Sequence, residues 1–571
     1  MGDLIQSTPV ISGLRKQYPN AHITLLVSNV FADFSKRIPH VDERVFFDIY
    51  QFKDKEQLNG VLWIRLYKYI ESLLKELKAK KYDLLINLSH SKLSAFMGSY
   101  LEINNMRGFG CNGAGDRVTR DSWMQYFGTE PFNRDFNPFN LVEIFTRSIG
   151  SAPEDNPINI QQDCGDNESI ADIVTQQNIK GGDFLIGIQA GSSLKGRRWS
   201  PRDFAELADG LVENYGAKII LFGVKSERLL AEEIKSFAQY KDKLVDLTGK
   251  TNFGQLSTLV KRCAYLVTND TGTMHIAAAV STPIIGLFFA HAHPFETGPY
   301  SPGHLIFQAR ISCAPCSYGV ECNNIVCVRK VRPEHILSMI KIHRKEGEWH
   351  LAETMSGLEE INIYCTYIGE DRRLRLRPLV KHSLGLNDIF REIYTTHWLN
   401  SLGTVQTSGL VSVNIEKLLL EDYDCSSAHN LSIRIEEKLY AINNLKNYAH
   451  EGIHCADEIS QIYPDNKSTK IARLKTLADK IESIDEEISQ IGFIHPELKP
   501  VTDMFSKRKE NFQGDDPLQL ANDTRTCYQS LLKEVGSLSE LLMSVAKTLN
   551  IIDDESCQAA VSSISVNVPG K

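Results

Sequence analysis

The feature that most constrains the fold is an alternation of short apolar strands and amphipathic helices over residues 1–345. Runs such as HITLLV (22–27), FLIGIQAG (184–191) and AYLVTND (264–270) are apolar along most of their length, as strands buried on both faces are. This alternation predicts an α/β doubly wound architecture with a parallel sheet. The helices between the strands are expected at 66–80, 203–215, 226–238 and 255–262.

Composition marks the domain boundaries. A polar link with two prolines, SAPEDNPINIQQDCGDNES, separates two βαβ stretches, so we expect domains at 1–150 and 180–345. Residues 350–410 contain a segment in which apolar and polar residues alternate as in strands. This pattern predicts a β-containing connector. Residues 411–571 become helical and predict a helical hairpin or bundle.

A heptad seam runs through the predicted C-terminal helices. Its apolar residues are spaced by three and four positions. Such a seam closes a bundle within the chain, or it pairs two copies into a homo-oligomer. The residues of the seam are Leu474, Leu477, Ile481, Ile484, Ile488 and Ile491.

Charge and composition exclude several classes of protein. The chain of 571 residues has 63 Lys and Arg against 71 Asp and Glu, a net charge of −8, so we expect no nucleic-acid partner. No apolar run is long enough for a membrane span, and the start MGDLIQSTPV lacks the basic region of a secretory signal. Twelve cysteines are too few for a disulfide scaffold. We therefore expect a cytoplasmic protein.

The most specific motif is TNDTGTMHIAAAV at 268–280. A strand is expected to end at Asn269-Asp270, and a helix of small residues to start near Thr273. Free backbone N–H groups at a helix start bind anions, and Gly272 permits a phosphate to approach closely. An ordinary βα turn capped by Asp or Thr fits the same residues.

Two further segments follow predicted strands. In GSSLKGRRWSPRDF (191–204), Arg197 and Arg198 stand just before a helix start, where two guanidinium groups suit a diphosphate. In LFGVKSERLLAEEI (221–234), Glu227 is placed to accept hydrogen bonds from ribose hydroxyls. The alternatives are a solvated basic loop and a first-turn Glu stabilised by the helix dipole.

Together these pieces resemble a known family. GD…TP at the N-terminus, R-R-W-S-P, L-F-G…E, L-T-G-K-T and N-D-T-G-T-M-H occur in order and resemble glycosyltransferase family 9, the ADP-heptose:lipopolysaccharide heptosyltransferases, over about 1–345. The resemblance implies a GT-B fold, with two Rossmann-like domains facing a cleft. The mainly α-helical C-terminal extension, expected from the pattern of residues 411–571, lies outside the resemblance. The resemblance also implies inverting transfer of heptose from ADP-heptose to lipopolysaccharide inner core or another glycan, with no cofactor required.

The resemblance assigns roles to individual residues. Asp3 would be the general base, Arg197 matches a position that usually holds Lys and would neutralise the leaving phosphate, and Glu227 would bind the ribose. In the family a strand precedes the Gly-Asp pair, whereas Met1 stands directly before it here, so we expect Met1 to be an internal methionine taken as the start. The chain as written would lack that strand and would place Asp3 on a mobile terminus. The residues expected to form the rest of the donor site are Arg198, Asp270, Thr271, Gly272, Thr273 and His275.

Cysteines cluster once in the chain, in the pattern Cys313-x2-Cys316-x5-Cys322-x4-Cys327. Four thiolates in so short a segment suit a tetrahedral metal ion. The segment therefore either binds structural Zn or Fe or carries free or disulfide-linked thiols.

A basic strip around 372–381 contains four arginines and a lysine. Its cationic face would meet acceptor phosphates or the anionic inner membrane, or it would be a solvated edge strand. For the whole chain, the alternatives to lipopolysaccharide heptose transfer are heptosylation of a protein and a non-catalytic, oligomeric assembly protein.

Overall fold

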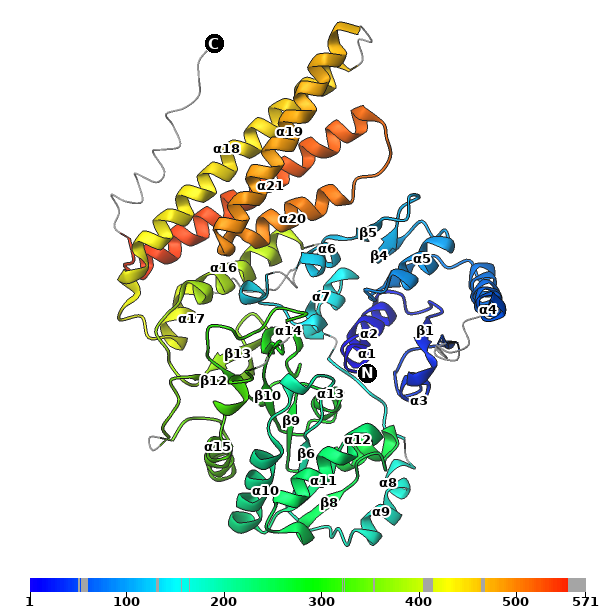
Figure 1. Cartoon of the computed structure of the whole chain (residues 1–571), viewed down its shortest axis with the longest axis vertical. Helices are drawn as coiled ribbons and strands as arrows, with labels where there is room; N and C mark the ends of the chain where they lie inside the picture. The colour runs from blue at the N-terminus through cyan, green and yellow to red at the C-terminus, as the bar shows by residue number, and fades with distance from the viewer. Residues whose placement is uncertain are drawn as a thin grey trace. The chain divides into compact units, whose positions relative to one another are not determined.

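The computed structural model describes residues 1–49, 52, 60–129, 133–155, 157–163, 165–320, 322, 324–352, 355–403, 414–463 and 468–552, and Figure 1 shows the whole chain. The described residues form two compact units. The first takes in residues of 1–56 and 139–382, and the second takes in residues of 57–138, 383–407 and 412–571. The segment 1–150 therefore contributes to both units, and the division into four domains stays a prediction.

An eight-stranded sheet organises the first unit, in the order β13-β12-β11-β10-β9-β6-β7-β8. Strands β6 to β11 are parallel to one another, and β6, β9, β10 and β11 are buried along their full length. The predicted parallel sheet is thus confirmed. Its strands are β6 (Leu185–Gln189), β7 (Lys218–Phe222), β8 (Leu244–Asp246), β9 (Tyr265–Asn269), β10 (Ile284–Phe288), β11 (Leu305–Ala309), β12 (Ile361–Ile368) and β13 (Leu374–Pro378).

Helices connect the parallel strands and begin and end at clear sequence signals. The helix over Pro201–Tyr215 is capped by Ser200, whose side chain accepts a hydrogen bond from the N–H of Asp203, and it ends at Gly216 with φ 63°, as expected of a left-handed helix end. The helices of this region are α10 (Pro201–Tyr215), α11 (Arg228–Phe237), α12 (Phe253–Arg262), α13 (Gly272–Ala279), α14 (Pro294–Thr297) and α15 (Pro333–Glu346).

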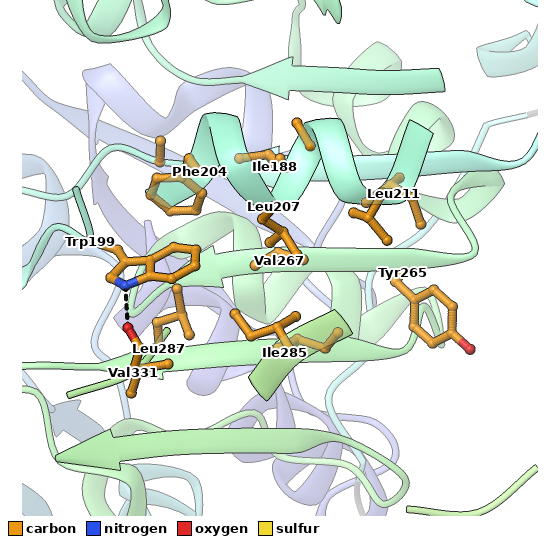
Figure 2. Packing of buried hydrophobic residues seen from close by; sticks show 14 of the residues in the cluster. Ile188, Trp199, Phe204, Leu207, Leu211, Tyr265, Val267, Ile285, Leu287 and Val331 are labelled. Atoms are coloured by element: carbon orange, nitrogen blue, oxygen red, sulfur yellow. Dashed lines mark hydrogen bonds between the residues drawn. The ribbon is translucent and has the colours of Figure 1, made fainter. Parts of the chain in front are cut away.

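One core lies between this sheet and its helices. Trp199 is completely buried and donates its indole N–H to the carbonyl of Val331 at 2.9 Å. Figure 2 shows this ring beside Phe204 of α10, with Val267 and Leu287 of the strands in the same cluster. The hydrogen bond satisfies the polar atom that burial of an indole would otherwise leave unpaired. The loop that carries Arg197 and Arg198 is therefore fixed at its end by a core residue.

The alternating segment near 360–382 forms β12 and β13, which add to the edge of the same sheet in antiparallel pairing. The arginines of the basic strip are occupied within the unit. Arg373 is 2% exposed and binds Glu143 through two hydrogen bonds of 2.7 and 3.0 Å, while Arg375 binds Asp371. Arg373 and Arg375 therefore do not contribute to a continuous cationic face toward phosphates, because buried carboxylates neutralise their charges.

The N-terminal residues of this unit pack on α13. Ile5, Phe34, Val142 and Ile276 share one core cluster, which joins α1, α3 and α7 to α13. Strands β1 and β2 form a separate parallel pair. The elements are α1 (Gly2–Gln6), α2 (Thr8–Gln17), β1 (Thr24–Ser28), α3 (Ala32–Ser35), β2 (Glu43–Phe47), α7 (Leu141–Ser148), α8 (Asp166–Ser169) and α9 (Ala171–Gln176).

The second unit combines a small sheet with the C-terminal helices. Strand β4 pairs parallel with β3 and antiparallel with β5. Its elements are α4 (Gly60–Ala79), β3 (Leu85–Asn87), α5 (Lys92–Tyr100), β4 (Met106–Cys111), β5 (Arg117–Arg120), α6 (Ser122–Thr129), α16 (Leu386–Ser401), α17 (Ile415–Asp422), α18 (Ser432–Ile462), α19 (Ser468–Ile494), α20 (Lys499–Glu510) and α21 (Pro517–Thr548).

The C-terminal helices form a bundle, drawn yellow to red in Figure 1, in which α18 packs against both α19 and α21. The seam residues Leu477, Ile484 and Ile488 are buried, so the seam packs within this bundle, and self-association stays a prediction. The bundle joins the small sheet, because Asn511 accepts a hydrogen bond from the N–H of Thr119. The predicted fold class is confirmed: α/β, Rossmann-like in its large sheet, with a mainly helical C-terminal region.

Among the described helices, none combines the length and the apolarity that a membrane span requires.

Candidate active site

The candidate site lies where the chain reverses its direction of winding across the large sheet. Strand β6 continues to β7 and β8 on one side, whereas its other neighbour, β9, continues to β10 and β11. The chain therefore runs from β6 toward one edge of the sheet and from β9 toward the other. Ligands of open α/β sheets bind at such a switch point, at the carboxyl ends of the strands. Arg197 and Arg198 follow β6, and Asp270 to Gly272 follow β9, so the predicted motifs meet at this point.

An ion pair joins the two loops. Nη2 of Arg197 lies 2.7 Å from Oδ2 of Asp270, and the hydroxyl of Thr297 donates to the same oxygen at 3.1 Å. Burial raises the pKa of Asp270 above its ordinary value, which the charge of Arg197 and the bond from Thr297 oppose. Asp270 thus holds the guanidinium group of Arg197 at the end of the sheet.

The start of α13 offers unpaired backbone donors. Thr271 is the N-cap residue, but its side chain makes no capping hydrogen bond, and no acidic residue lies in the first turn. Instead its hydroxyl pairs with that of Thr268 at 3.2 Å. Among the described residues, no side chain therefore caps the first N–H groups of α13, which form the positive end of the helix.

The N-terminal helix α1 lies against this helix start. A Cβ atom on Gly272 would come within 3.4 Å of the N atom of Gly2, and the negative charge of Asp3 is among the causes that raise the pKa of Asp270. Asp3 is exposed. The structure thus brings the predicted base and the predicted diphosphate-binding turn together.

Gln189 is a site residue that the sequence analysis missed. It is 4% exposed at the last position of β6, donates to Oε2 of Glu227 at 3.1 Å and accepts from the hydroxyl of Thr273 at 3.1 Å. It therefore links the proposed ribose ligand to α13. A polar residue that ends an otherwise apolar strand was the only sequence signal for it.

Glycines make room for Glu227. A Cβ atom on Gly191 would lie 1.8 Å from Oε1 of Glu227, and one on Gly223 would lie 2.7 Å from Oε2. Oε2 also accepts the backbone N–H of Val224 at 2.9 Å. None of the described residues donates a hydrogen bond to Oε1, so this oxygen keeps its accepting capacity at the carboxyl ends of β6 and β7.

The other predicted arginine stabilises its own loop. Nε and Nη2 of Arg198 both donate to the carbonyl of Ser192, at 2.9 and 2.5 Å. Its partner in the sequence pair, Arg197, instead reaches across to β9. The two adjacent guanidinium groups thus have different neighbours.

Several buried polar atoms at this end of the sheet have no hydrogen-bond partner among the described residues. They are Oγ of Ser192, Nε of Arg197, Oγ1 of Thr248 and Nδ1 of His275. Unpaired buried donors and acceptors are uncommon in proteins, and their grouping after β6, β8 and β9 marks a place where a polar ligand would complete their hydrogen bonds. Burial lowers the pKa of His275 to about 3, so its ring is neutral.

The four clustered cysteines lie in the segment after β11. Cys313 and Cys322 are exposed, Cys327 is buried, and no disulfide joins them. Burial raises the pKa of the Cys327 thiol. The described residues contain no group of three or more His, Cys, Asp or Glu side chains arranged to hold a metal ion, and the metal site stays a prediction from spacing.

Comparison with known proteins identifies relatives of the region that contains this site. Residues 70–324 match the model of glycosyltransferase family 9 (heptosyltransferase). The chain is 25% identical to lipooligosaccharide heptosyltransferase 2 of Haemophilus influenzae over 313 residues, 53% of this chain and 82% of that protein. It is 26% identical to lipopolysaccharide heptosyltransferase 3 of Escherichia coli over 310 residues, 52% of this chain and 81% of that protein.

Solved structures include similar chains. A glycosyltransferase family 9 protein from Veillonella parvula aligns with a TM-score of 0.49 at 22% identity, covering 60% of this chain and 94% of its own. The ADP-heptose heptosyltransferase II of E. coli aligns with a TM-score of 0.45 at 21% identity and the same coverage. The family model ends at residue 324, before the C-terminal helices. Residues 70–324 therefore match glycosyltransferase family 9 (heptosyltransferase), and the relatives to which the chain is similar are named heptosyltransferases.

Proposed function

We propose that the chain transfers heptose from ADP-heptose to a hydroxyl group of lipopolysaccharide inner core or a related glycan. The observation that supports this most directly is the convergence of Arg197, the start of α13 and helix α1 at the switch point between β6 and β9. The names of the relatives, lipooligosaccharide and lipopolysaccharide heptosyltransferases, support the sugar and the acceptor. We place the reaction at the cytoplasmic side of the inner membrane, where such an acceptor would be presented.

In this proposal the donor is held by its diphosphate and its ribose. The N–H groups at the start of α13 and the guanidinium group of Arg197 would face the diphosphate, since both present positive charge at one end of the sheet. Oε1 of Glu227 would accept hydrogen bonds from the ribose hydroxyls. Arg197 already has one partner, Asp270, so the diphosphate would add to this pair or replace it.

The transfer itself needs a base and a stabilised leaving group. The carboxylate of Asp3 would take the proton of the acceptor hydroxyl as its oxygen attacks the anomeric carbon. The bond from the anomeric carbon to the diphosphate breaks in the same step, and ADP leaves with the bonding electrons. Its new charge would be stabilised by Arg197 and by α13, and a single displacement inverts the configuration.

The test is release of ADP when the whole protein is mixed with ADP-heptose and a series of inner-core acceptors, with the glycosylated product identified by mass spectrometry. Asp3→Asn should abolish transfer and leave ADP affinity unchanged, because it removes only the base. Asp33→Asn, an exposed first-turn aspartate on α3, is the matched control and should transfer normally. Normal transfer by the Asp3 variant, or no transfer to any acceptor by the unaltered chain, would contradict the proposal. Transfer to a protein acceptor alone would favour the protein-heptosylating alternative.

A further inference from the structure

A short chain of hydrogen bonds connects the donor side of the site to the helix that carries Asp3. It begins at α14, whose last residue, Thr297, donates to Asp270 at 3.1 Å. Asp270 in turn holds Arg197 at 2.7 Å. Displacement of α14 would therefore move the oxygen that fixes the guanidinium group.

The residue that follows α14 is held in place from another element. The carbonyl of Gly298 accepts a hydrogen bond of 3.1 Å from Nδ2 of Asn140. A Cβ atom at position 298 would lie 2.3 Å from the carbonyl oxygen of Pro294, so the glycine allows the chain to turn tightly here. Asn140 thus anchors the C-terminal end of α14.

Asn140 also contacts α1. Its Oδ1 accepts from the N–H of Val142 at 3.1 Å, which caps α7, and from Nε2 of Gln6 at 3.4 Å. Asn140 and Gln6 are 6% and 1% exposed, so these bonds are protected from water. Gln6 lies on α1, one helical turn after Asp3.

We propose that Asn140 is a positioning residue for the transfer reaction. Its amide group fixes α1, which carries Asp3, relative to the two loops that carry Asp270 and Arg197. Capping of α7 alone requires only the oxygen of this side chain, whereas the bond to Gly298 requires its nitrogen as well. Proton removal and departure of ADP need the base and the cationic group at a set separation, and small displacements slow such reactions strongly. The inference rests on the proposed function, because it takes Asp3 to be the base.

The variant Asn140→Ser separates the two roles. Serine caps a helix as well as asparagine does, but its side chain is too short to reach Gly298 and Gln6. The matched control is Asn252→Ser, because Asn252 caps α12 with the same reciprocal arrangement and its side chain accepts from its own helix, at the N–H of Gln255. The second variant is Gln6→Met, which removes only the amide that donates to Asn140 and leaves the caps of α7 and α12 intact.

We expect Asn140→Ser to lower kcat about tenfold or more while the affinity for ADP changes less than twofold, and Gln6→Met to lower kcat in the same direction. Asn252→Ser should leave kcat unchanged. Equal losses of kcat in the Asn140 and Asn252 variants would show that Asn140 has a structural role only. A loss of ADP affinity that matches the loss of kcat would show the same. Unchanged kcat in the Asn140 variant would also overturn the inference.

Hydrogen–deuterium exchange distinguishes failure of this inference from failure of the proposed function, because it needs no turnover. Peptides that cover α1 and α14 should both exchange faster in Asn140→Ser, and neither should in Asn252→Ser. If the unaltered chain transfers no heptose but both peptides exchange faster in Asn140→Ser, the proposed function fails and the positioning role of Asn140 stands. If transfer occurs and neither peptide exchanges faster, only the positioning role fails.

Discussion

Gly2 lies directly against His275: a Cβ atom on Gly2 would come within 3.1 Å of Cδ2 of the imidazole ring. His275 is 3% exposed and belongs to α13, the helix whose start we assign to the diphosphate. The absence of a side chain at position 2 therefore lets α1 approach α13 closely, and the neighbour of Gly2 in the chain is Asp3. The close packing of these two helices determines where the proposed base stands.

Substitution of Gly2 should therefore impair transfer more than stability. Gly2→Val adds three carbon atoms next to the His275 ring and should push α1 away from α13. We expect kcat to fall about tenfold or more, since displacement of a catalytic group by about 1 Å can lower rates 100-fold. Gly182→Ala is the control, because nothing lies within 4 Å of a Cβ atom there. Unchanged kcat in the Gly2 variant would contradict the proposed place of Asp3.

Much of this geometry could be predicted from the sequence, because its signals are local. Apolar runs of five or more residues between amphipathic helices predicted the large sheet, and the residues after β6 and β9 converge because carboxyl ends of parallel strands share one edge. Gln189, Thr297 and Asn140 were missed for the opposite reason. Each acts through a partner far away in the sequence, and a single buried amide or hydroxyl leaves no periodic pattern.

The basic strip also shows what a local sequence pattern cannot predict. Charged and apolar residues alternate around Arg373. This alternation correctly predicted strand β13, which begins directly after Arg373. Alternation assigns side chains to faces of a strand, but it does not tell which face is buried. The partner that neutralises Arg373 is Glu143, 230 positions earlier in the chain, and no local feature of the sequence points to it.

The Arg197–Asp270 pair predicts a double effect of removing the guanidinium group. Among the described residues, Arg197→Ala leaves the buried carboxylate of Asp270 with Thr297 as its hydrogen-bond partner. We expect this to cost about 2 kcal/mol of folding free energy, a value reduced because Arg197 is partly exposed. ADP affinity should fall about tenfold, as expected for loss of one charge-assisted contact. Arg197→Lys keeps the charge and should retain most of both. Thermal unfolding and calorimetric ADP titration measure the two effects.

The control for this prediction is Arg202→Ala. Arg202 is an exposed residue of α10, with its guanidinium group over the ring of Phe237. It should bind ADP normally and unfold at nearly the same temperature. An Arg197→Ala protein with unchanged ADP affinity would show that the diphosphate binds elsewhere.

Two buried neutral histidines predict acid sensitivity of the first unit. Burial lowers the pKa of both His275 and His304 from 6.5 to about 3. His304 accepts the N–H of Ile284 on Nδ1 at 3.2 Å, which requires an unprotonated nitrogen. The unfolded chain takes up protons below pH 6.5 and the folded chain does not, so this contribution to stability is complete above pH 6.5 and declines as the pH falls toward 3.

At pH 4.5 each histidine should therefore have lost about 2–3 kcal/mol of its contribution. His304→Gln should reduce the difference in urea unfolding free energy between pH 7.5 and pH 4.5, whatever its effect at pH 7.5. His350→Gln is the control. The hydrogen bond from His350 to Glu346 raises the pKa of His350, so its removal cannot diminish acid destabilisation. The same pH difference in His304→Gln and the unaltered chain would contradict this account.

The pair of Arg373 and Glu143 predicts a strong coupling between the β12–β13 hairpin and α7. Both side chains are 2% exposed, so removal of either charge leaves the other buried without its nearest counter-charge; Asp371 lies 3.9 Å from Arg373. We expect Glu143→Leu or Arg373→Met alone to lower the free energy of unfolding by about 3 kcal/mol. The double variant should lose clearly less than the sum, because an apolar pair needs no ionic partner and the desolvation of two charges is avoided. Arg147 lies 3.8 Å from Glu143 and binds Glu154 at 2.5 Å, so it retains a carboxylate in both variants. A double-mutant cycle by urea unfolding measures the coupling energy, and additive losses would show that the two residues stabilise the fold independently.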